Sequence, residues 1–273
     1  MSSATPSATL YVIPGSHACR TAMLMLEHKD LAYRRVDLPT GLHPLGVRLY
    51  GFPGHRTPIR RVDGRTHHAL AVLDRLGTVP ALRVADDRIQ TNRNIARFLE
   101  RLQPEPPLFA GNPEHRRAIE AAELWGDAVL QMVARRLGLA AALHGLDALH
   151  ERGNGGRLGA LLAGNESVRI LSARVSALVA FRATPAKEEE LLAGIPAMLD
   201  KIDAWIGAGV LGGAQLNAAD FMIAPSIALL AYRRDLRPQI QARAAGSLLE
   251  RVLPEPGPPE RPTHPSFDMA PSG

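Results

Sequence analysis

The sequence predicts two domains, a small α/β domain followed by an all-helical domain. Three observations support this prediction. The first hundred residues alternate between short apolar strands and amphipathic helices, as a βαβ unit with parallel strands does. A proline-rich stretch, "QPEPPLFAGNP" (103–113), then interrupts the pattern. Beyond this stretch apolar residues recur every three or four positions, which indicates helices almost throughout.

The first domain is predicted to begin strand, helix, strand. Its strands are expected at 9–13, 31–38 and 79–90, the last being two short strands around a turn at Asp86-Asp87, and its helices at 17–29 and 91–102. The Pro- and Gly-rich segment 39–56 is predicted as a loop. Residues 57–76 echo residues 79–102 in order and composition. We expect residues 79–102 to form the strand and helix of the domain, because their strand is more apolar and their helix better formed. Residues 55–77 would then be an insertion.

The second domain is predicted to begin at Asn112-Pro113, a side-chain cap followed by a proline at the first helical position. Its helices are expected from there to about 143, and at 166–182, 186–208 and 217–235, with a glycine-rich break at 153–165. The tail from Pro254 has seven prolines in twenty residues and is predicted to be disordered. The predicted organisation is a first domain 1–103, a linker 104–112, a helical domain 113–253 and a tail 254–273.

Composition excludes several classes of function. The net charge is +5, but the arginines are mixed with acidic residues along the helices, which is typical of a salt-bridged surface rather than of a nucleic-acid site. Cys19 is the only cysteine, so neither a disulfide nor an all-cysteine metal site is expected. We find no signal peptide and no apolar run of about 20 residues that would span a membrane, and expect a cytoplasmic protein without a metal.

One helix start carries a specific capping pattern. In "LNAADF" (216–221), Asn217 is predicted to cap the helix and Asp220 to reach back to the Asn217 N–H, which forms a capping box. Leu216 and Phe221 are placed for the hydrophobic contact that accompanies such a box. Asp220 is therefore predicted to stabilise the fold rather than to act as a catalytic acid.

Four segments, taken in order, resemble the glutathione transferase family. They are "LYVIPGSHACR" (10–20), "TVPAL" (78–82), "IQTNRNIARFL" (89–99) and "LNAADFMIAPSIALL" (216–230). The resemblance implies a thioredoxin-like first domain, an all-helical second domain, glutathione as cosubstrate, a hydrophobic electrophile and a homodimer. It also implies a cis Val79-Pro80 bond, whose Val79 backbone would pair with a bound peptide. Residue statistics alone favour a trans proline at a strand start.

Ser16 stands where a redox protein of this fold would carry its attacking cysteine. A thiol with a pKa of about 8.5 needs roughly 2.7 kcal/mol of preferential anion stabilisation to lower its pKa by two units. A hydroxyl that donates to a thiolate contributes about 1.5–3 kcal/mol, and a helix N-terminus about 0.3–1 kcal/mol more. The resemblance implies that Ser16 stabilises the thiolate of a bound cosubstrate. The alternative is that Ser16 is only a helix cap.

Neighbouring residues receive lesser roles. Cys19 is predicted to be a small packing residue, with mixed-disulfide chemistry as the alternative. His17 could add positive charge near a bound anion, or be half exposed without a role. Arg20 matches an arginine that the family often carries, and an outward salt bridge is equally compatible with its position. Trp125, Met132 and Leu139 are candidates for an apolar wall beside the electrophile, or else plain core.

The sequence departs from the family at Thr91-Asn92, where many relatives carry an acidic residue followed by serine that hold the γ-glutamyl group. Thr91 and Asn92 can still form hydrogen bonds, and the helix start favours a carboxylate. The countercharge for the ammonium would have to come from Asp86 or Asp87. The main hypothesis is therefore a glutathione-dependent transferase, and the alternative is a non-catalytic binding protein that has kept the fold without the thiol site.

Overall fold

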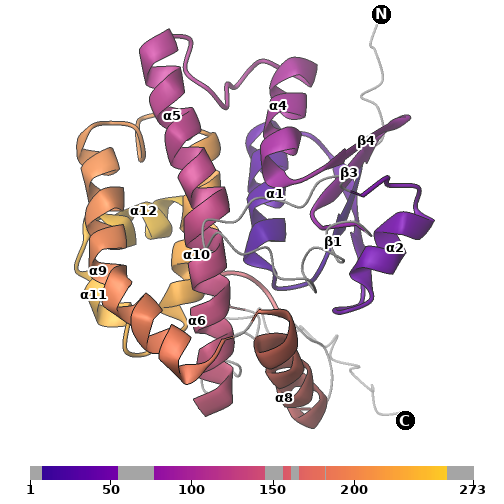
Figure 1. Ribbon diagram of the computed structural model, residues 1–273. Helices are drawn as coiled ribbons and strands as arrows, with labels where there is room; N and C mark the ends of the chain where they lie inside the picture. The colour runs from indigo at the N-terminus through magenta and orange to yellow at the C-terminus, as the bar shows by residue number, and fades with distance from the viewer. Residues whose placement is uncertain (1–7, 55–76, 145–155, 161–165, 182, 257–273) are drawn as a thin grey trace, which may run out of the picture.

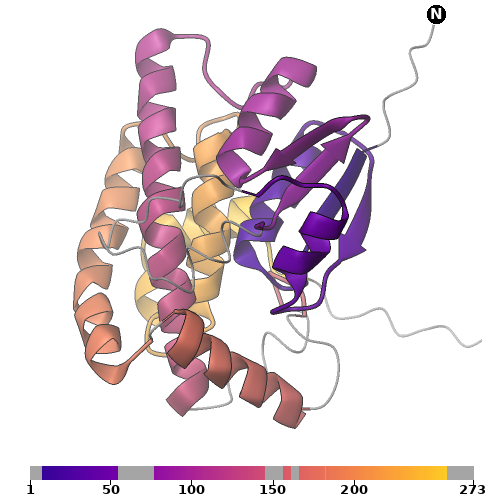
Figure 2. The same ribbon diagram turned by 45° about the vertical axis from the view of Figure 1, so that its right-hand side comes forward.

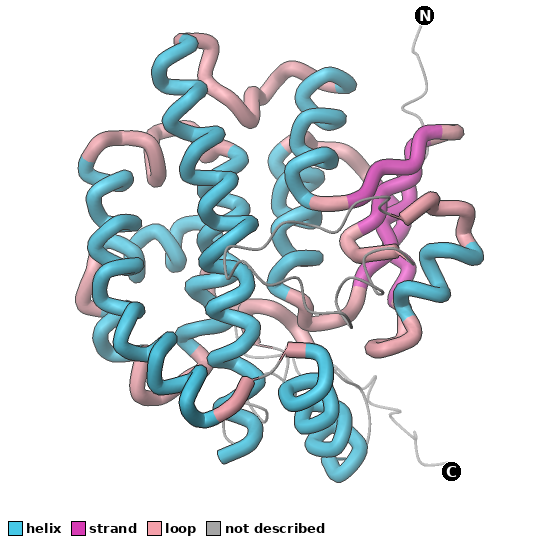
Figure 3. The backbone as a smooth tube through the Cα atoms, in the orientation of Figure 1, coloured by secondary structure: helices cyan, strands magenta, loops and turns pink. Residues whose placement is uncertain are grey.

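The structure, a computed structural model, describes residues 8–54, 77–144, 156–160, 166–181 and 183–256. The repeat copy at 57–76 and residues 257–273 of the tail lie outside the described residues. A small sheet with helices on both faces stands beside a bundle of helices, as Figures 1 and 3 show. This arrangement confirms the predicted fold class.

The sheet has four strands in the order β2-β1-β3-β4. They are β1 (Ala8–Val12), β2 (Tyr33–Asp37), β3 (Ala81–Val84) and β4 (Asp87–Gln90). β1 pairs with β2 in parallel, and the β1–β3 and β3–β4 pairs are antiparallel. The predicted parallel first pair and the later hairpin are both confirmed. The hairpin turn lies one residue earlier than predicted, with Ala85 in the left-handed region at φ 50°.

The two faces of the sheet are covered by different helices (Figure 2). α1 (His17–His28) and α4 (Asn92–Leu102) lie between the sheet and the bundle, and α2 (His43–Leu49) covers the opposite face. Side chains alternate accordingly along the fully buried β1. Leu10 and Val12 join the main core, whereas Tyr11 packs with Phe52 and Val47 under α2.

The loop prediction for 39–56 is wrong in part, because α2 forms within it. Pro44 stands in the first turn of α2, where its missing N–H costs no helical hydrogen bond. Pro44 and Val47 are buried against the sheet. Proline marks the start of a helix here rather than a break.

The bundle begins with a long helix that contains one π-helical turn. It runs through α5 (Pro113–Trp125), the π turn η1 (Gly126–Leu130) and α6 (Gln131–His144). Asn112 caps it as predicted, and its Oδ1 accepts the Glu114 and His115 N–H groups at 2.9 and 3.0 Å. The bundle continues with α8 (Glu166–Val175), η2 (Ser176–Ala180), α9 (Pro185–Gly207), α10 (Ala218–Ala231), α11 (Arg237–Gln241) and α12 (Ala244–Val252).

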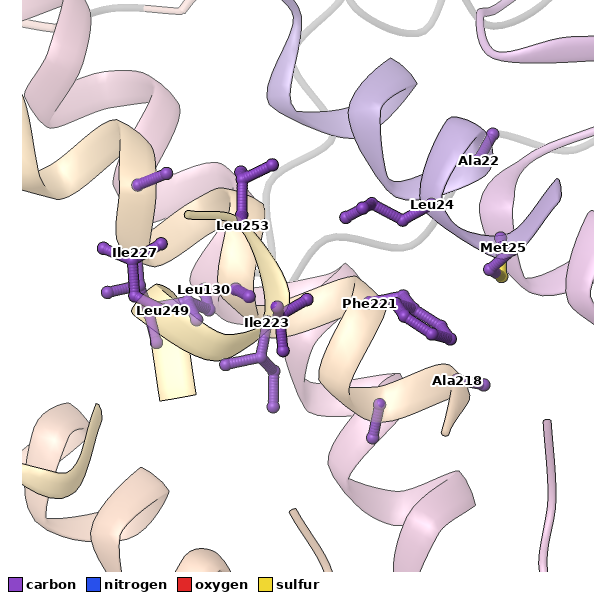
Figure 4. Close-up of a cluster of buried hydrophobic side chains, with 14 of the residues drawn as sticks. Ala22, Leu24, Met25, Leu130, Ala218, Phe221, Ile223, Ile227, Leu249 and Leu253 are labelled. Carbon is purple, nitrogen blue, oxygen red and sulfur yellow. The ribbon is translucent and has the colours of Figure 1, made fainter. Parts of the chain in front are cut away.

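α10 is the central helix of the bundle and packs against α1, α5, α6 and α12. Figure 4 shows Phe221 and Ala218 of α10 near Met25 of α1, and Ile223 near Leu130. The predicted capping box is present: Asn217 Oδ1 accepts the Ala219 N–H at 2.9 Å, and Asp220 Oδ2 accepts the Asn217 N–H at 2.9 Å. Because α10 is buried on almost every side, this cap stabilises the middle of the molecule.

Two helices after α10 were not predicted. α10 ends at Ala231 rather than near 235, and α11 and α12 follow it. Pro238 lies in the first turn of α11, and Arg243 precedes α12 without a side-chain cap. These short helices lack the cap signals that mark the longer ones.

Ion pairs with one buried partner hold α4 against the long helix and the end of α1 against the connecting segment. Glu123 of α5 is fully buried and pairs with Arg93 and Arg97 of α4. The fully buried Lys29 donates to Glu100 at 2.9 Å and to the carbonyls of Gln103 and Pro104 at the start of the connecting segment. The start of α4 is thereby held next to the long helix, where the candidate site lies.

Candidate functional site

The turn before α1 presents Ser16 as the cap of that helix. Gly15 has φ +66°, a left-handed conformation that favours glycine. Ser16 Oγ accepts the Cys19 N–H at 3.4 Å. A hydroxyl has one proton and two acceptor sites, so accepting the cap bond leaves the Ser16 proton for donation, either to the neighbouring Cys19 sulfur or to a ligand. The capping role and the proposed thiolate contact are therefore compatible at this residue.

Cys19 is a packing residue, as predicted. Its side chain is fully buried, and its Sγ accepts the Ile13 N–H at 3.4 Å. Burial raises the pKa of the Cys19 thiol, although the Ile13 and Ser16 hydrogen bonds oppose that shift. A buried thiol with a raised pKa is a poor nucleophile.

His17 lies inside the molecule rather than half exposed. It is 3% exposed, and its Nε2 donates to the Gln131 carbonyl of the long helix at 3.2 Å. This contact comes from the second domain, 114 residues away, so local sequence could not predict it. Arg20 forms the outward salt bridge, with Glu27 at 2.7 Å.

Val79 and Pro80 lie beside this turn. The Val79-Pro80 bond is cis, as the resemblance implied. Both residues line a cleft together with Ala18 of α1. The Val79 carbonyl accepts the Thr78 hydroxyl at 3.4 Å.

Thr91 and Asn92 lie at the same cleft and start α4. Thr91 Oγ1 caps the helix by accepting the Asn94 N–H at 3.4 Å, with φ +72°. Asn92 is 3% exposed, and its Nδ2 donates to the Ala18 carbonyl at 3.0 Å. The Asn92 Oδ1 is buried without a hydrogen-bond donor. A buried acceptor without a donor costs about 1–3 kcal/mol relative to one that is hydrogen-bonded.

The opposite wall of the cleft comes from the long helix. It consists of Asp127, Gln131, Met132 and Arg135. Of the three residues considered as either an apolar wall or plain core, only Met132 lies at the cleft. Trp125 instead packs edge-on against Trp205 at 5.3 Å, and Leu139 packs in a separate cluster with Ala177 of η2 and with Ala183. The sequence analysis did not single out Asp127, Gln131 and Arg135. Their four-residue spacing places all three on one face of a helix, and this was the signal that could have identified them.

The cleft is small and charged. Its volume is ≈ 70 Å³, against about 300–1,000 Å³ for a typical ligand pocket, so only an end group of a ligand fits inside it. Ser16 is not among the residues that line it. Arg135 is near enough to lower the pKa of His43, which burial and this charge together bring to about 4.

Asp86 and Asp87 cannot supply the countercharge expected of them. They stand at the turn of the β3–β4 hairpin, and Thr91 follows the other end of β4. At about 3.3 Å per residue, the strand places Asp87 roughly 13 Å from Thr91, and Asp86 farther away still. The acidic residue at the cleft is Asp127, from the helical domain.

Solved structures share this architecture. A glutathione S-transferase of Ceriporiopsis subvermispora, in complex with glutathione, superposes with a TM-score of 0.57 and 15% identity over 90% of this chain and 94% of that one. FzlA from C. crescentus has a TM-score of 0.54 and 18% identity over 90% and 87%. The chain has the glutathione S-transferase fold. A glutathione S-transferase from Rhodospirillum rubrum F11 is also similar, with a TM-score of 0.51 and 20% identity over 90% and 87%.

Neither the protein-family models nor the curated proteins include a match to the sequence. Among the described residues, no helix is long and apolar enough to cross a bilayer. Within the same residues, no cluster of His, Cys, Asp and Glu could hold a metal ion. The likeness to glutathione S-transferases therefore rests on the fold, and the activity has to be argued from the cleft.

Proposed function

We propose that this protein binds a low-molecular-weight thiol, glutathione first among them, and transfers it to a hydrophobic electrophile. The observation that carries the proposal is the Ser16 hydroxyl at the start of α1, which accepts the cap bond from the Cys19 N–H and has one proton, which it could donate to a ligand's sulfur in place of the Cys19 sulfur. The bound cosubstrate would supply the thiol. Ser16 would donate to its sulfur and stabilise the anion at the start of α1.

The residues of the cleft support a peptide-like thiol. The Val79 backbone lies at the cleft beside the cis proline, and the start of α4 favours a carboxylate. The buried Asn92 Oδ1 lacks a donor, which an ammonium or amide N–H would supply. Cys19 takes no part, because its thiol is buried and its pKa raised.

A second candidate function is binding without catalysis. The small volume of the cleft and the position of Ser16 outside its lining favour it. Under this alternative the protein binds the thiol, or a related end group, without activating it.

Calorimetric titration with glutathione, followed by conjugation to an aryl halide, separates the two functions. The proposal predicts saturable binding and thiol conjugation that Ser16→Gly reduces at least tenfold. Glycine is nearly as good a helix cap as serine, so this variant removes the hydroxyl with little loss of stability, and Ser16→Thr should restore activity. Binding with no conjugation by the unaltered protein would support the second function, and no binding at millimolar glutathione would contradict both.

A further inference from the structure

One row across the sheet carries three arginines and no acidic residue. Thr9 of β1 lies between Arg34 of β2 and Arg83 of β3. Arg83 in turn faces Arg88 of β4. Neighbouring strands are about 4.8 Å apart, so the Cα atoms of this arginine row span roughly 14 Å. Among the described residues, no carboxylate forms an ion pair with any of the three arginines. Like charges on neighbouring strands repel, so the row costs stability that a bound anion would restore.

The arginine row lies on the face of the sheet that α2 covers in part. Side chains alternate along a strand, so Thr9 shares a face with Tyr11, which packs under α2. Arg88 links the row to the end of α2, because its Nε donates to the Tyr50 carbonyl at 3.4 Å. The three arginines of the row are exposed or half-buried. The row and the outer side of α2 therefore present neighbouring surfaces to the solvent.

The outer side of α2 is an apolar ridge. Pro44 and Val47 bury the inner side of the helix against the sheet. With about 3.6 residues per turn, the leucines at and just before α2 lie on the opposite side. This leucine ridge consists of Leu42, Leu45 and Leu49, which are 61%, 53% and 88% exposed. Figure 2 shows α2 on the outer side of the sheet, away from the bundle. The leucines therefore project from a convex part of the molecule.

We propose that the leucine ridge and the arginine row together dock the protein on an anionic lipid bilayer. The leucines would enter the boundary between headgroups and acyl chains, and the arginines would bind lipid phosphates. A bilayer accepts a convex ridge without a complementary groove. A nucleic acid would bind the arginines and leave the leucines in water, and a symmetric contact with a second copy would bring two arginine rows together.

This inference goes beyond the proposed function and does not depend on it. Neither the ridge nor the row lines the cleft, so docking leaves the candidate site unobstructed. Binding of a thiol and binding of a bilayer can therefore be tested separately.

The test is sedimentation of the full chain with vesicles of phosphatidylcholine, either alone or with about 30 mol% phosphatidylserine. We expect binding to the anionic vesicles that is at least tenfold tighter than to the neutral ones and that weakens in about 1 M salt. The double variant Leu45→Ser with Leu49→Ser should bind the anionic vesicles at least tenfold more weakly, because it removes the inserted side chains. Arg34→Gln with Arg83→Gln should cause a similar loss and abolish most of the salt dependence.

Matched controls remove the same kinds of side chain elsewhere. Leu171→Ser with Leu178→Ser removes two leucines of α8 and η2 that are 64% and 56% exposed. Arg101→Gln with Arg117→Gln removes two exposed charges from α4 and α5. Both controls should bind the anionic vesicles within twofold of the unaltered protein, and thermal unfolding by circular dichroism verifies that every variant is folded.

Three results would overturn the inference and leave the proposed function standing. The first is no binding of the unaltered protein to the anionic vesicles. The second is vesicle binding that the leucine substitutions on α2 leave unchanged, which would indicate a surface for polyanions in general. The third is a dimer in solution, measured by analytical ultracentrifugation, that the same substitutions dissociate, since the ridge would then bind a second copy of the chain.

Discussion

Two helix starts in this molecule carry a buried asparagine, Asn217 at α10 and Asn92 at α4, but they differ in how completely their polar atoms are used. At α10, Asn217 Oδ1 accepts two backbone N–H groups, its Nδ2 donates to the Val210 carbonyl, and both Asp220 oxygens accept backbone N–H groups. At α4, Thr91 accepts one long hydrogen bond and Asn92 keeps a buried oxygen without a donor.

The difference separates a structural cap from a candidate binding site. A chain that buries polar groups for stability satisfies them internally, as at α10. A buried acceptor that the chain leaves without a donor costs free energy, which a ligand with a donor can recover. The two starts should therefore respond in opposite ways to substitution.

The largest effect is expected at α10. Asp220→Ala leaves the buried Asn217 and Gly212 N–H groups without their acceptor, so we expect a loss of about 2–4 kcal/mol in the free energy of unfolding. Urea unfolding measures it. The folded variant should bind glutathione with unchanged affinity, and a loss below about 0.5 kcal/mol would contradict the structural role.

The same residue should give the protein a pH dependence. Burial raises the pKa of Asp220 to about 6, although the Gly212 and Asn217 N–H bonds oppose the shift. Because the pKa in the folded state exceeds that in the unfolded state, the part of its contribution that depends on protonation is complete below about pH 4 and is lost as the pH rises through about 6, by on the order of 2–3 kcal/mol. Unfolding at several pH values should show this slope, and Asp220→Ala should lack it. An identical slope in the variant would assign the dependence to other groups.

The α4 start should show the opposite pattern. Asn92→Leu removes the unpartnered oxygen together with one bond to the Ala18 carbonyl, which lies within a helix and has a backbone donor there. We expect glutathione to bind at least tenfold more weakly, about 1.4 kcal/mol, while the free energy of unfolding changes by less than about 1 kcal/mol. Calorimetry and urea unfolding measure the two quantities. Unchanged affinity would make Asn92 a structural residue like Asn217.

The smallest effect is expected at Cys19. Because its thiol is buried and its pKa raised, iodoacetamide should alkylate the folded protein far more slowly than the urea-unfolded protein. Cys19→Ala should leave thiol conjugation within about twofold and lower stability by about 1 kcal/mol for the lost packing. Equal alkylation rates in the folded and the urea-unfolded protein would contradict the burial of Cys19 and would show that the turn before α1 opens readily.

The parts of the fold that could be predicted are those whose sequence signals lie in neighbouring residues. The Asn217–Asp220 box and the first parallel strand pair are written in consecutive residues, and both are confirmed. The helices with Pro44 and Pro238 in their first turns were missed because proline also marks loops. The burial of His17 depends on Gln131, 114 residues later.

The candidate site could be predicted only on one side. Val79, Pro80, Thr91 and Asn92 meet at the cleft because the motifs of the first domain are local. Their partners Asp127, Gln131 and Arg135 come from the bundle, and only tertiary packing brings them to the same place. For the same reason the sequence left Asp86 and Asp87 open as sources of the countercharge, although the hairpin places both at the far end of the strand from Thr91.

The proposed function depends most on whether the Ser16 hydroxyl donates its proton to a ligand's sulfur. The direct measurement is the pKa of the bound glutathione thiol, followed by the ultraviolet absorbance of the thiolate across a pH titration of the complex. The account predicts a pKa about one to two units below that of the free thiol, returning toward the free value in Ser16→Gly and lowered again in Ser16→Thr. The same thiol pKa in the unaltered protein and in Ser16→Gly would contradict it.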